Sequence, residues 1–536
     1  MKCFQMVTNI LVYRWLINRK WKLQNLFNRT MTNIIPCPCI EKLPCVPDVC
    51  DVGPISEQPK VLIIGAGVAG LSAAQRLFQC GVKNVIILEA APRPGGRIYT
   101  CDCEHSPVDL GAQWIYGGCH SNMIFNLACQ ENLIKPPLEI FSPYRGVCLT
   151  SDGEVIKAHI RKKAVQHFHT IKLKAKELFK SGESSAHDNI SLRQYLDRNI
   201  KSVLKKKFTE GERSLASKVM YGLTNDIKAR MGGNLESIPV KKYGARTEIP
   251  GGDTAIKRDF SSILSPMINM IPKENIIFKK PIRTIKWKHP IYDDRRAEVY
   301  CCDGTVFQAD FVILTVSLGV LKRHHEEMFC PCLPESKLEA INKLGFGNVA
   351  KIFLGYKRPF WLPTEGKFRL AWSENEIHKE DWLNSIGLIE EAPSHGKNLL
   401  VTVGGDEAFC VETVSSVKIV EKVTEIMRTF LSNQTIPYPK NILRSNWGHN
   451  AFTYGAVTYL GNESFLAHIK DLGSPIPLIK DSVAPVLLFA GEATSVGHYG
   501  TVQGARLSGI REAERILMIT KRFGGKPKPD TFATCV

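Results

Sequence analysis

Three glycines and one glutamate have the spacing of a site that binds a dinucleotide. Gly65, Gly67 and Gly70 follow the pattern G-x-G-x-x-G, and Glu89 comes 19 residues after the last of them (89 − 70 = 19). The first glycine permits a tight turn, the second lets the backbone approach a pyrophosphate, and the third lets a helix pack closely on a strand. A carboxylate at this distance can accept hydrogen bonds from a ribose. We predict a dinucleotide site here, the alternative being an ordinary tight turn.

The elements around these residues fit that prediction. Residues 61–64 and 85–88 are short, wholly apolar runs of the kind that buried parallel strands need. Between them, Leu71, Ala74 and Leu77 recur at helical spacing. The N-terminus of such a helix presents free N–H groups and a positive dipole end to phosphates.

The rest of the chain predicts an α/β protein in which two domains alternate. Residues 276–278, 282–287 and 311–316 are expected to be strands that return to a sheet, and residues 155–230 to be mainly helical. A buried strand at 485–490 and a final helix through 507–517 follow. We expect an extension at 1–58, a nucleotide-binding domain of 59–150, 245–330 and 440–525, a second domain of 151–244 and 331–439, and a tail at 526–536.

The bulk properties are those of a soluble globular protein. Of the 536 residues, 44% are hydrophobic and 23% charged, and no apolar run is long enough to span a membrane. The 17 cysteines are scattered without metal-site spacing, which predicts mostly reduced thiols and a cytoplasmic protein. The first 40 residues hold six basic residues and no acid, so a mitochondrial presequence, a disordered tail or a later start at Met31 are alternatives.

The net charge of +18 is concentrated in residues 157–207, which carry fourteen Lys or Arg and four acids. This segment is either a solvated helical face or a surface for an acidic partner. No stretch resembles a nucleic-acid-binding module, and we predict no nucleic-acid partner.

Further stretches specify the dinucleotide. Residues 93–97 read Arg-Pro-Gly-Gly-Arg, residues 109–114 read Asp-Leu-Gly-Ala-Gln-Trp, and residues 491–494 read Gly-Glu-Ala-Thr, with Thr-Val-Gln-Gly following at 501–504. Singly, these could be a surface turn, a core tryptophan and a helix cap. Together, and with residues 315–322 and 443–448, they make the chain resemble the flavin-containing amine oxidases over residues 60–517. The resemblance is greatest to the spermine and polyamine oxidase branch.

The resemblance implies non-covalent FAD and a Rossmann-like FAD-binding domain interleaved with an α+β substrate domain. It implies that Glu89 holds the adenosine ribose, Arg97 the phosphates and Glu492 the ribityl–pyrophosphate region. The remaining residues expected at the cofactor are Gly65, Gly67, Ala69, Gly70, Gln113, Trp114, Ile282, Thr501 and Val502.

Lys351 is the candidate catalytic residue. It lies in the otherwise apolar run of residues 349–354, where burial of an ammonium group is costly and lowers its pKa. On spacing alone, an edge-strand lysine that reaches water is the more common case. Similar family members place a lysine here, linked through water to flavin N5, which implies a role in handling protons.

Two positions depart from the family pattern and bear on the substrate. Polyamine oxidases carry Trp-Ile-His-Gly where this chain has Tyr116, and a tyrosine after Gly-Ser where it has Val457. Both residues are expected in the substrate channel. Phe452, Tyr454 and Tyr459 are nearby aromatic residues, which could replace the missing tyrosine or belong to the core.

The predicted function is FAD-dependent oxidation of polyamines or secondary amines. Hydride passes to flavin N5 and then to oxygen, with release of hydrogen peroxide, so the expected partners are a small amine and oxygen. A relationship to histone-lysine demethylases is disfavoured because residues 249–440 contain no long coiled-coil insertion. The alternative of another class is an FAD-binding protein without amine turnover, which serves in binding or redox sensing.

Overall fold

The computed structural model describes residues 58–103, 106–134, 145–181, 190–256, 259–287, 297–379, 381–392, 396–478 and 484–523, all of which belong to one compact unit. The predicted tail and all but Gln58 of the predicted N-terminal extension lie outside these residues. Ten cysteines of the described part are free thiols, and Cys80 is disulfide-bonded.

A five-stranded parallel sheet contains the predicted dinucleotide turn. Its order is β21 (Leu487–Phe489), β12 (Phe311–Leu314), β1 (Val61–Ile64), β2 (Val85–Leu88) and β8 (Ile276–Ile277). Every residue of β1 and β12 is buried, as expected of parallel strands that are covered on both faces. The strands predicted from apolar runs at 61–64, 85–88, 276–278, 311–316 and 485–490 are therefore confirmed.

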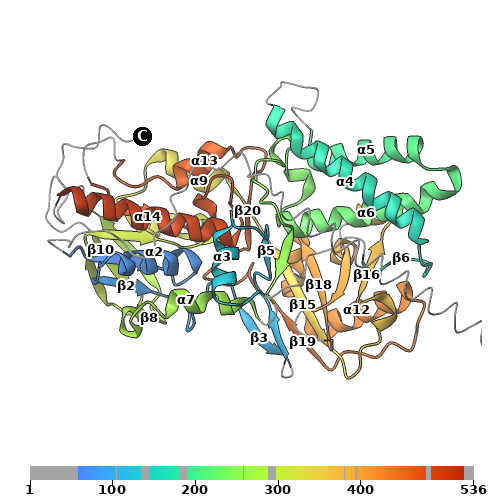
Figure 1. Cartoon of the computed structure of the whole chain (residues 1–536), viewed down its shortest axis with the longest axis horizontal. Helices are drawn as coiled ribbons and strands as arrows, with labels where there is room; N and C mark the ends of the chain where they lie inside the picture. Colours follow the sequence, from blue (N-terminus) through green and yellow to red (C-terminus); the bar gives the residue numbers. More distant parts are fainter. Residues whose placement is uncertain are drawn as a thin grey trace, which may run out of the picture. The chain divides into compact units, whose positions relative to one another are not determined.

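Two helices from opposite ends of the described chain pack side by side on this sheet. They are α2 (Val68–Gln79) and α14 (Val502–Phe523), drawn in blue and red in Figure 1. A Cβ atom on Gly509 would lie 2.0 Å from the carbonyl oxygen of Ala69, so the two backbones are in direct contact. The final helix predicted through residues 507–517 is thus part of the nucleotide-binding region.

The predicted strand at 282–287 exists but belongs to another sheet. It is β9 (Ile282–Trp287), which pairs with β10 (Ala297–Cys301) and β13 (Phe329–Cys330), while β11 (Val306–Ala309) completes the four strands. Alternate residues of β10 are buried, which is typical of an antiparallel sheet with one face toward the core.

A six-stranded sheet forms the core of the second region. Its order is β19 (Asn441–Arg444), β15 (Val349–Gly355), β18 (Asn398–Gly404), β17 (Leu388–Glu391), β16 (Lys367–Ala371) and β6 (Val147–Thr150). Helix α6 (Glu210–Met231) packs on β16 and β18, and α12 (Ser416–Phe430) shares a hydrophobic core with the strands (Figure 1). Strands β6 and β19 pair in this sheet, although both lie in ranges that we expected to belong to the nucleotide-binding domain. The proposed domain boundaries stay a prediction.

The predicted helical region of residues 155–230 consists of α4 (Ala158–Ser181), α5 (Leu192–Lys207) and α6. Several of its basic residues have carboxylate partners: Lys163 pairs with Glu212, and Lys201 with Glu374. These pairs account for part of the basic segment, and an acidic partner for the rest stays a prediction. No helix among the described residues is long and apolar enough to cross a membrane.

Short strand pairs carry site residues between the large sheets. These are β3 (Thr100–Cys103) with β4 (Ser106–Asp109), β5 (Trp114–Tyr116) with β7 (Asp253–Ala255), and β14 (Gly345–Gly347) with β20 (Val457–Tyr459). The remaining helices are α3 (Met123–Gln130), α7 (Ser265–Ile268), α8 (Leu318–Met328), α9 (Glu335–Lys343), α10 (Glu374–Ile377), α11 (Asp406–Thr413) and α13 (Leu466–Leu472).

Candidate active site

A cavity of about 1120 Å³ brings together residues from distant parts of the chain. Such a volume exceeds that of most pockets for drug-sized ligands, and an extended dinucleotide with a substrate beside it needs a larger space. Of the fifteen predicted site residues, all but Gly70 line this cavity. They are Gly65, Gly67, Ala69, Glu89, Arg97, Gln113, Trp114, Tyr116, Ile282, Lys351, Val457, Glu492, Thr501 and Val502.

The three glycines of the turn are needed for three different reasons. Gly65 has φ +107°, which side chains rarely adopt, and a Cβ on Gly70 would lie 2.0 Å from the carbonyl oxygen of Gly65. Gly67 has an extended backbone and no protein atom within 4 Å of the position of a Cβ. A methyl group there would project into the open cavity and would contact no protein atom. The need for glycine at this position is therefore explained by a ligand that binds close to the backbone, and not by packing within the protein.

Glu89 and the start of α2 line the part of the cavity at the glycine turn. The Glu89 carboxylate accepts hydrogen bonds from the N–H groups of Ala66 (2.6 Å) and Ala91 (2.8 Å). Burial raises the pKa of Glu89, and these backbone donors oppose that rise. Gly67 provides no side-chain cap, so the first-turn N–H groups of α2 stay available to a phosphate.

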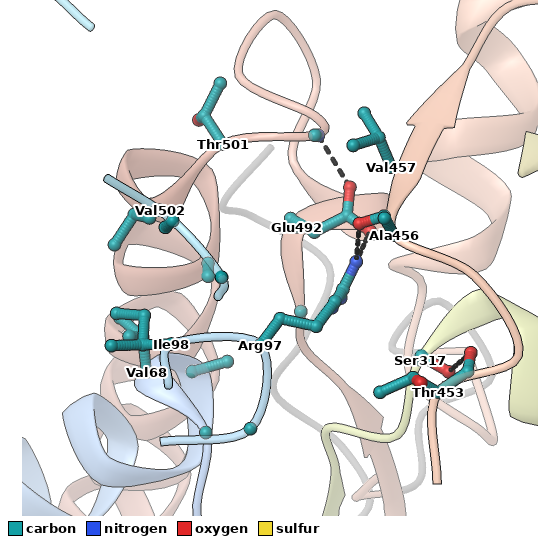
Figure 2. Close-up of a pocket in the computed structure, with 18 of the residues that line it drawn as sticks. Val68, Arg97, Ile98, Ser317, Thr453, Ala456, Val457, Glu492, Thr501 and Val502 are labelled. Atoms are coloured by element: carbon teal, nitrogen blue, oxygen red, sulfur yellow. Dashed lines mark hydrogen bonds and ion pairs between the residues drawn. The ribbon is translucent and has the colours of Figure 1, made fainter. Parts of the chain in front are cut away.

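Arg97 crosses the cavity to Glu492, as Figure 2 shows. Its Nη1 donates to Glu492 Oε1 at 2.8 Å and to the carbonyl oxygen of Ala456 at 2.7 Å. Glu492 is only 5% exposed and also accepts from the Thr458 hydroxyl (2.8 Å) and the Gly500 N–H (2.6 Å). This network ties the turn after β2 to β20 and to the loop before α14.

Thr501 caps the N-terminus of α14. Its Oγ1 accepts from the N–H of Gly504 at 3.0 Å and donates to the carbonyl oxygen of His498 at 2.6 Å. Val502 begins the helix, so the positive end of the helix dipole faces the cavity beside these two residues. This is the location that the family resemblance implies for the flavin ring.

Lys351 lies on β15, which has neighbours on both sides, so it is not an edge-strand lysine. Its Nζ donates to the carbonyl oxygens of Asp109 (2.9 Å) and Gly111 (2.7 Å) and to Gln113 Oε1 (2.6 Å). Three acceptors match the three N–H bonds of an ammonium group. Burial nevertheless lowers the pKa of Lys351 to about 8, so the group can lose and regain a proton near neutral pH.

Gln113 and Trp114 join this lysine to the cavity wall. Gln113 is 6% exposed, and its Nε2 has no hydrogen-bond partner although its Oε1 is held by Lys351. A buried amide donor without an acceptor is costly unless a ligand supplies one. Trp114 also lines the cavity, and the prediction of both residues at the cofactor remains the best account of them.

The two departures from the family pattern both face the cavity. Tyr116 is 37% exposed, and the guanidinium of Arg230 lies 4.5 Å above its ring and forms an ion pair with Asp253. Val457 begins β20. Of the nearby aromatic residues, Phe452 and Tyr454 line the cavity, whereas Tyr459 lies outside its described lining.

Several cavity residues were not predicted. Arg230 comes from the helical region, and Arg246 comes from the loop after it. Ser317 and Thr453 also line the cavity, and the Ser317 hydroxyl donates a hydrogen bond of 2.7 Å to the carbonyl oxygen of Thr453. For Arg246 the available signal was its position just before the Gly251-Gly252 turn. Nothing in the sequence near Arg230 distinguishes it from the other basic residues of the helices.

With this geometry in place, the chain can be assigned to a class. It belongs to the flavin containing amine oxidoreductases, whose family model matches residues 68–517. FAD is the cofactor of this family, and the open cradle at Gly67, the unpaired amide of Gln113 and the start of α2 fit its phosphates and rings.

Individual proteins are similar to this chain in sequence or in fold. The chain is 31% identical over 494 residues to Protein anon-37Cs of Drosophila lebanonensis, covering 86% of this chain and 88% of that one. It is 30% identical over 512 residues to the human peroxisomal N(1)-acetyl-spermine/spermidine oxidase, covering 89% and 98%. A solved structure of putrescine oxidase bound to putrescine shares the fold, with a TM-score of 0.64, 19% identity, and coverage of 86% of this chain and 99% of that one.

A histone demethylase homologue is also similar in sequence, but it is longer than this chain. The lysine-specific histone demethylase 1 homolog 2 of Arabidopsis thaliana is 28% identical over 86% of this chain, which spans only 58% of that protein. Between residues 249 and 440, the longest described helix is α12, with 15 residues.

Proposed function

We propose that this amine oxidase acts on polyamines or secondary amines. The observation that supports it most directly is the position of Lys351, which is hydrogen-bonded to Gln113 in the wall of a cavity that begins at a dinucleotide turn. One of the relatives named above is an N(1)-acetyl-spermine/spermidine oxidase, which supports an aliphatic amine as substrate.

Different residues along the cavity bind different parts of the cofactor. Glu89 and the start of α2 bind the adenosine and phosphate end of the cofactor, while Arg97 and Glu492 hold its middle. Thr501, Val502, Gln113 and Trp114 orient the flavin end. When bound, FAD accepts a hydride from the carbon next to the amine nitrogen and passes the electrons to oxygen, releasing hydrogen peroxide.

Lys351 handles protons at this end of the cavity. Because its pKa is about 8, a neutral and a charged form are both accessible at physiological pH. In its neutral form the amine has two N–H bonds for three acceptors, so a water molecule bound at Nζ can exchange protons with it. The fit to the amine oxidases favours turnover over an FAD-binding protein without activity.

The test is anaerobic addition of amines to the purified yellow protein. Spermine, spermidine, their N-acetylated forms and monoamines are each added, and loss of the flavin absorption is followed, with peroxide release measured after air is admitted. Bleaching by at least one of these amines is expected. A protein that stays yellow with all of them contradicts amine oxidation and supports the binding alternative.

The compartment is a separate proposal. A cytoplasmic protein with mostly reduced thiols remains our proposal, and the mammalian relatives are named as peroxisomal proteins. Fractionation of cells that express the full chain would distinguish these sites and the mitochondrial alternative.

A further inference from the structure

The substrate part of the cavity, around Tyr116 and Val457, contains more positive than negative charge. Lys176, Arg230 and Arg246 line it, together with the carboxylates of Glu248 and Asp253. Asp253 is paired with Arg230 and Glu248 with Lys176, so both carboxylates already have a cation from this chain. A substrate with several ammonium groups therefore meets no free carboxylate among these lining residues.

Arg246 is the cation in this part that has no carboxylate partner among the described residues. Its Nη2 makes a long hydrogen bond of 3.5 Å to the carbonyl oxygen of Thr458, and its buried Nε has no partner. The guanidinium lies 5.1 Å from the centroid of the Tyr499 ring. A guanidinium has five N–H donors, so most of the donor capacity of Arg246 is unused.

Arg246 lies close to Val457, the position at which the family resemblance implies a tyrosine. A Cβ atom on Gly500 would be 2.6 Å from Arg246 Nη2 and 2.9 Å from Val457 Cγ1, so both side chains border Gly500. Gly500 immediately precedes Thr501, which caps α14 at the flavin end. The guanidinium thus stands beside the small Val457 side chain, in the region where relatives of this branch place a tyrosine.

We propose that Arg246 binds an oxygen acceptor on the substrate, a carbonyl of an N-acyl group or a carboxylate, and selects such amines over free polycations. This inference rests on the proposed amine oxidation and specifies its substrate. A guanidinium repels a nearby ammonium group and donates charge-assisted hydrogen bonds to a carbonyl or carboxylate oxygen. Arg246 is therefore a specificity residue that contacts the oxygen acceptor of the substrate and not the carbon that loses the hydride.

The experiment compares three probes on one scaffold: spermidine, N1-acetylspermidine, and the analogue in which a carboxylate replaces the acetamide group. The wild type is expected to have a higher kcat/KM for one or both oxygen-bearing probes than for spermidine. The Arg246→Leu variant should lose about tenfold or more in kcat/KM on the preferred probe, mainly through KM, because a hydrogen bond to a charged group is lost. Its kcat/KM for spermidine should stay unchanged or rise.

Two further variants separate charge from shape. Arg246→Lys keeps the charge and should retain part of the preference, more for the carboxylate probe than for the neutral amide. Arg198→Leu removes the same charge from the exposed surface of α5, away from the cavity, and should leave the preference intact. The flavin absorption of each purified variant shows that it has folded with its cofactor.

The outcomes distinguish this inference from the proposed function. An Arg246→Leu variant that stays yellow and loses activity equally on all three probes, or on none, overturns the role of Arg246 while amine oxidation stands. If no amine bleaches the wild type, amine oxidation is contradicted instead. The shift of the flavin spectrum on titration with the acetylated probe then still measures its binding, and equal dissociation constants for the wild type and Arg246→Leu would overturn the inference.

Discussion

Lys351 Nζ donates a 2.6 Å hydrogen bond to Oε1 of Gln113, whose Nε2 is left buried and without a partner. The lysine lies on β15, and the glutamine just precedes β5. The proton state of Lys351 and the orientation of the Gln113 amide in the cavity wall are thereby linked.

The first prediction concerns the chemistry of Lys351. Lys351→Met should slow flavin reduction or reoxidation by about a hundredfold or more, as expected when a positioned proton carrier is lost. Stopped-flow absorbance with anaerobic amine, and then with oxygen, measures the two steps separately. A variant whose two rates both equal those of the wild type would remove the proposed role.

The second prediction concerns pH and stability. Burial lowers the pKa of Lys351 to about 8 in the folded protein from an ordinary 10.5, so between these values the unfolded chain binds more protons. The unfolding free energy of the wild type relative to Lys351→Met should therefore rise as the pH increases from 8 to 10, and be lowest below pH 8. Denaturant titrations of both proteins across this range measure it, and a difference that does not depend on pH would contradict the burial of Lys351.

The third prediction separates two glycines of the same turn. Because the backbone of Gly67 is extended and its Cβ would meet no protein atom, Gly67→Ala should leave the apoprotein as stable or more stable by about 0.4–1 kcal/mol. Its affinity for FAD should fall about tenfold or more, because the methyl group occupies the space of the pyrophosphate.

Gly70→Ala is the matched variant. Its Cβ would collide with the carbonyl oxygen of Gly65, so it should destabilise the apoprotein itself by about 1–3 kcal/mol. Thermal unfolding of apoprotein and FAD titration by flavin fluorescence measure the pair. Equal effects of both substitutions on the apoprotein would contradict the assignment of Gly67 to the cofactor.

The fourth prediction concerns the ion pair across the cavity. Glu492→Gln leaves the Arg97 guanidinium without its carboxylate in a site where Glu492 is 5% exposed, and should cost about 1.5–3 kcal/mol of stability, the range for hydrogen bonds to charged groups. Glu514→Gln breaks an ion pair with Arg76 in which the carboxylate is 39% exposed, and should cost less than about 1 kcal/mol. Urea unfolding of both variants measures the two losses of unfolding free energy. Equal losses would contradict the hydrogen-bond network that we describe around Glu492.

Much of the nucleotide-binding region could be predicted because its signals are local. The turn at residues 65–70 with its flanking apolar runs contains its own strand, helix and strand, and the structure places them as expected. The strand at 282–287 was also correct as an element. The sheet to which this strand belongs was not predicted correctly. Its pairing depends on β10 and β13, whose sequences show only a weak hydrophobic pattern.

The surroundings of Lys351 and Arg246 could not be derived from neighbouring sequence. The acceptors of Lys351 lie some 240 residues earlier in the chain, and backbone carbonyl oxygens leave no trace in residue types. Arg246 owes its unpaired state to the pairing of Asp253 and Glu248 with other cations. Which cations and carboxylates pair can be seen only in the folded chain, where α4, α6 and the loop after α6 line the same cavity.

The backbone contact between Gly509 and Ala69 bears on when the flavin can bind during synthesis of the chain. The cradle at the start of α2 is completed by α14, which is synthesised more than 400 residues later. A nascent chain on the ribosome therefore has its first strand and helix long before it has a finished cofactor site. We expect the flavin to bind only after the last helix has emerged, so C-terminal truncations that remove α14 should yield colourless protein.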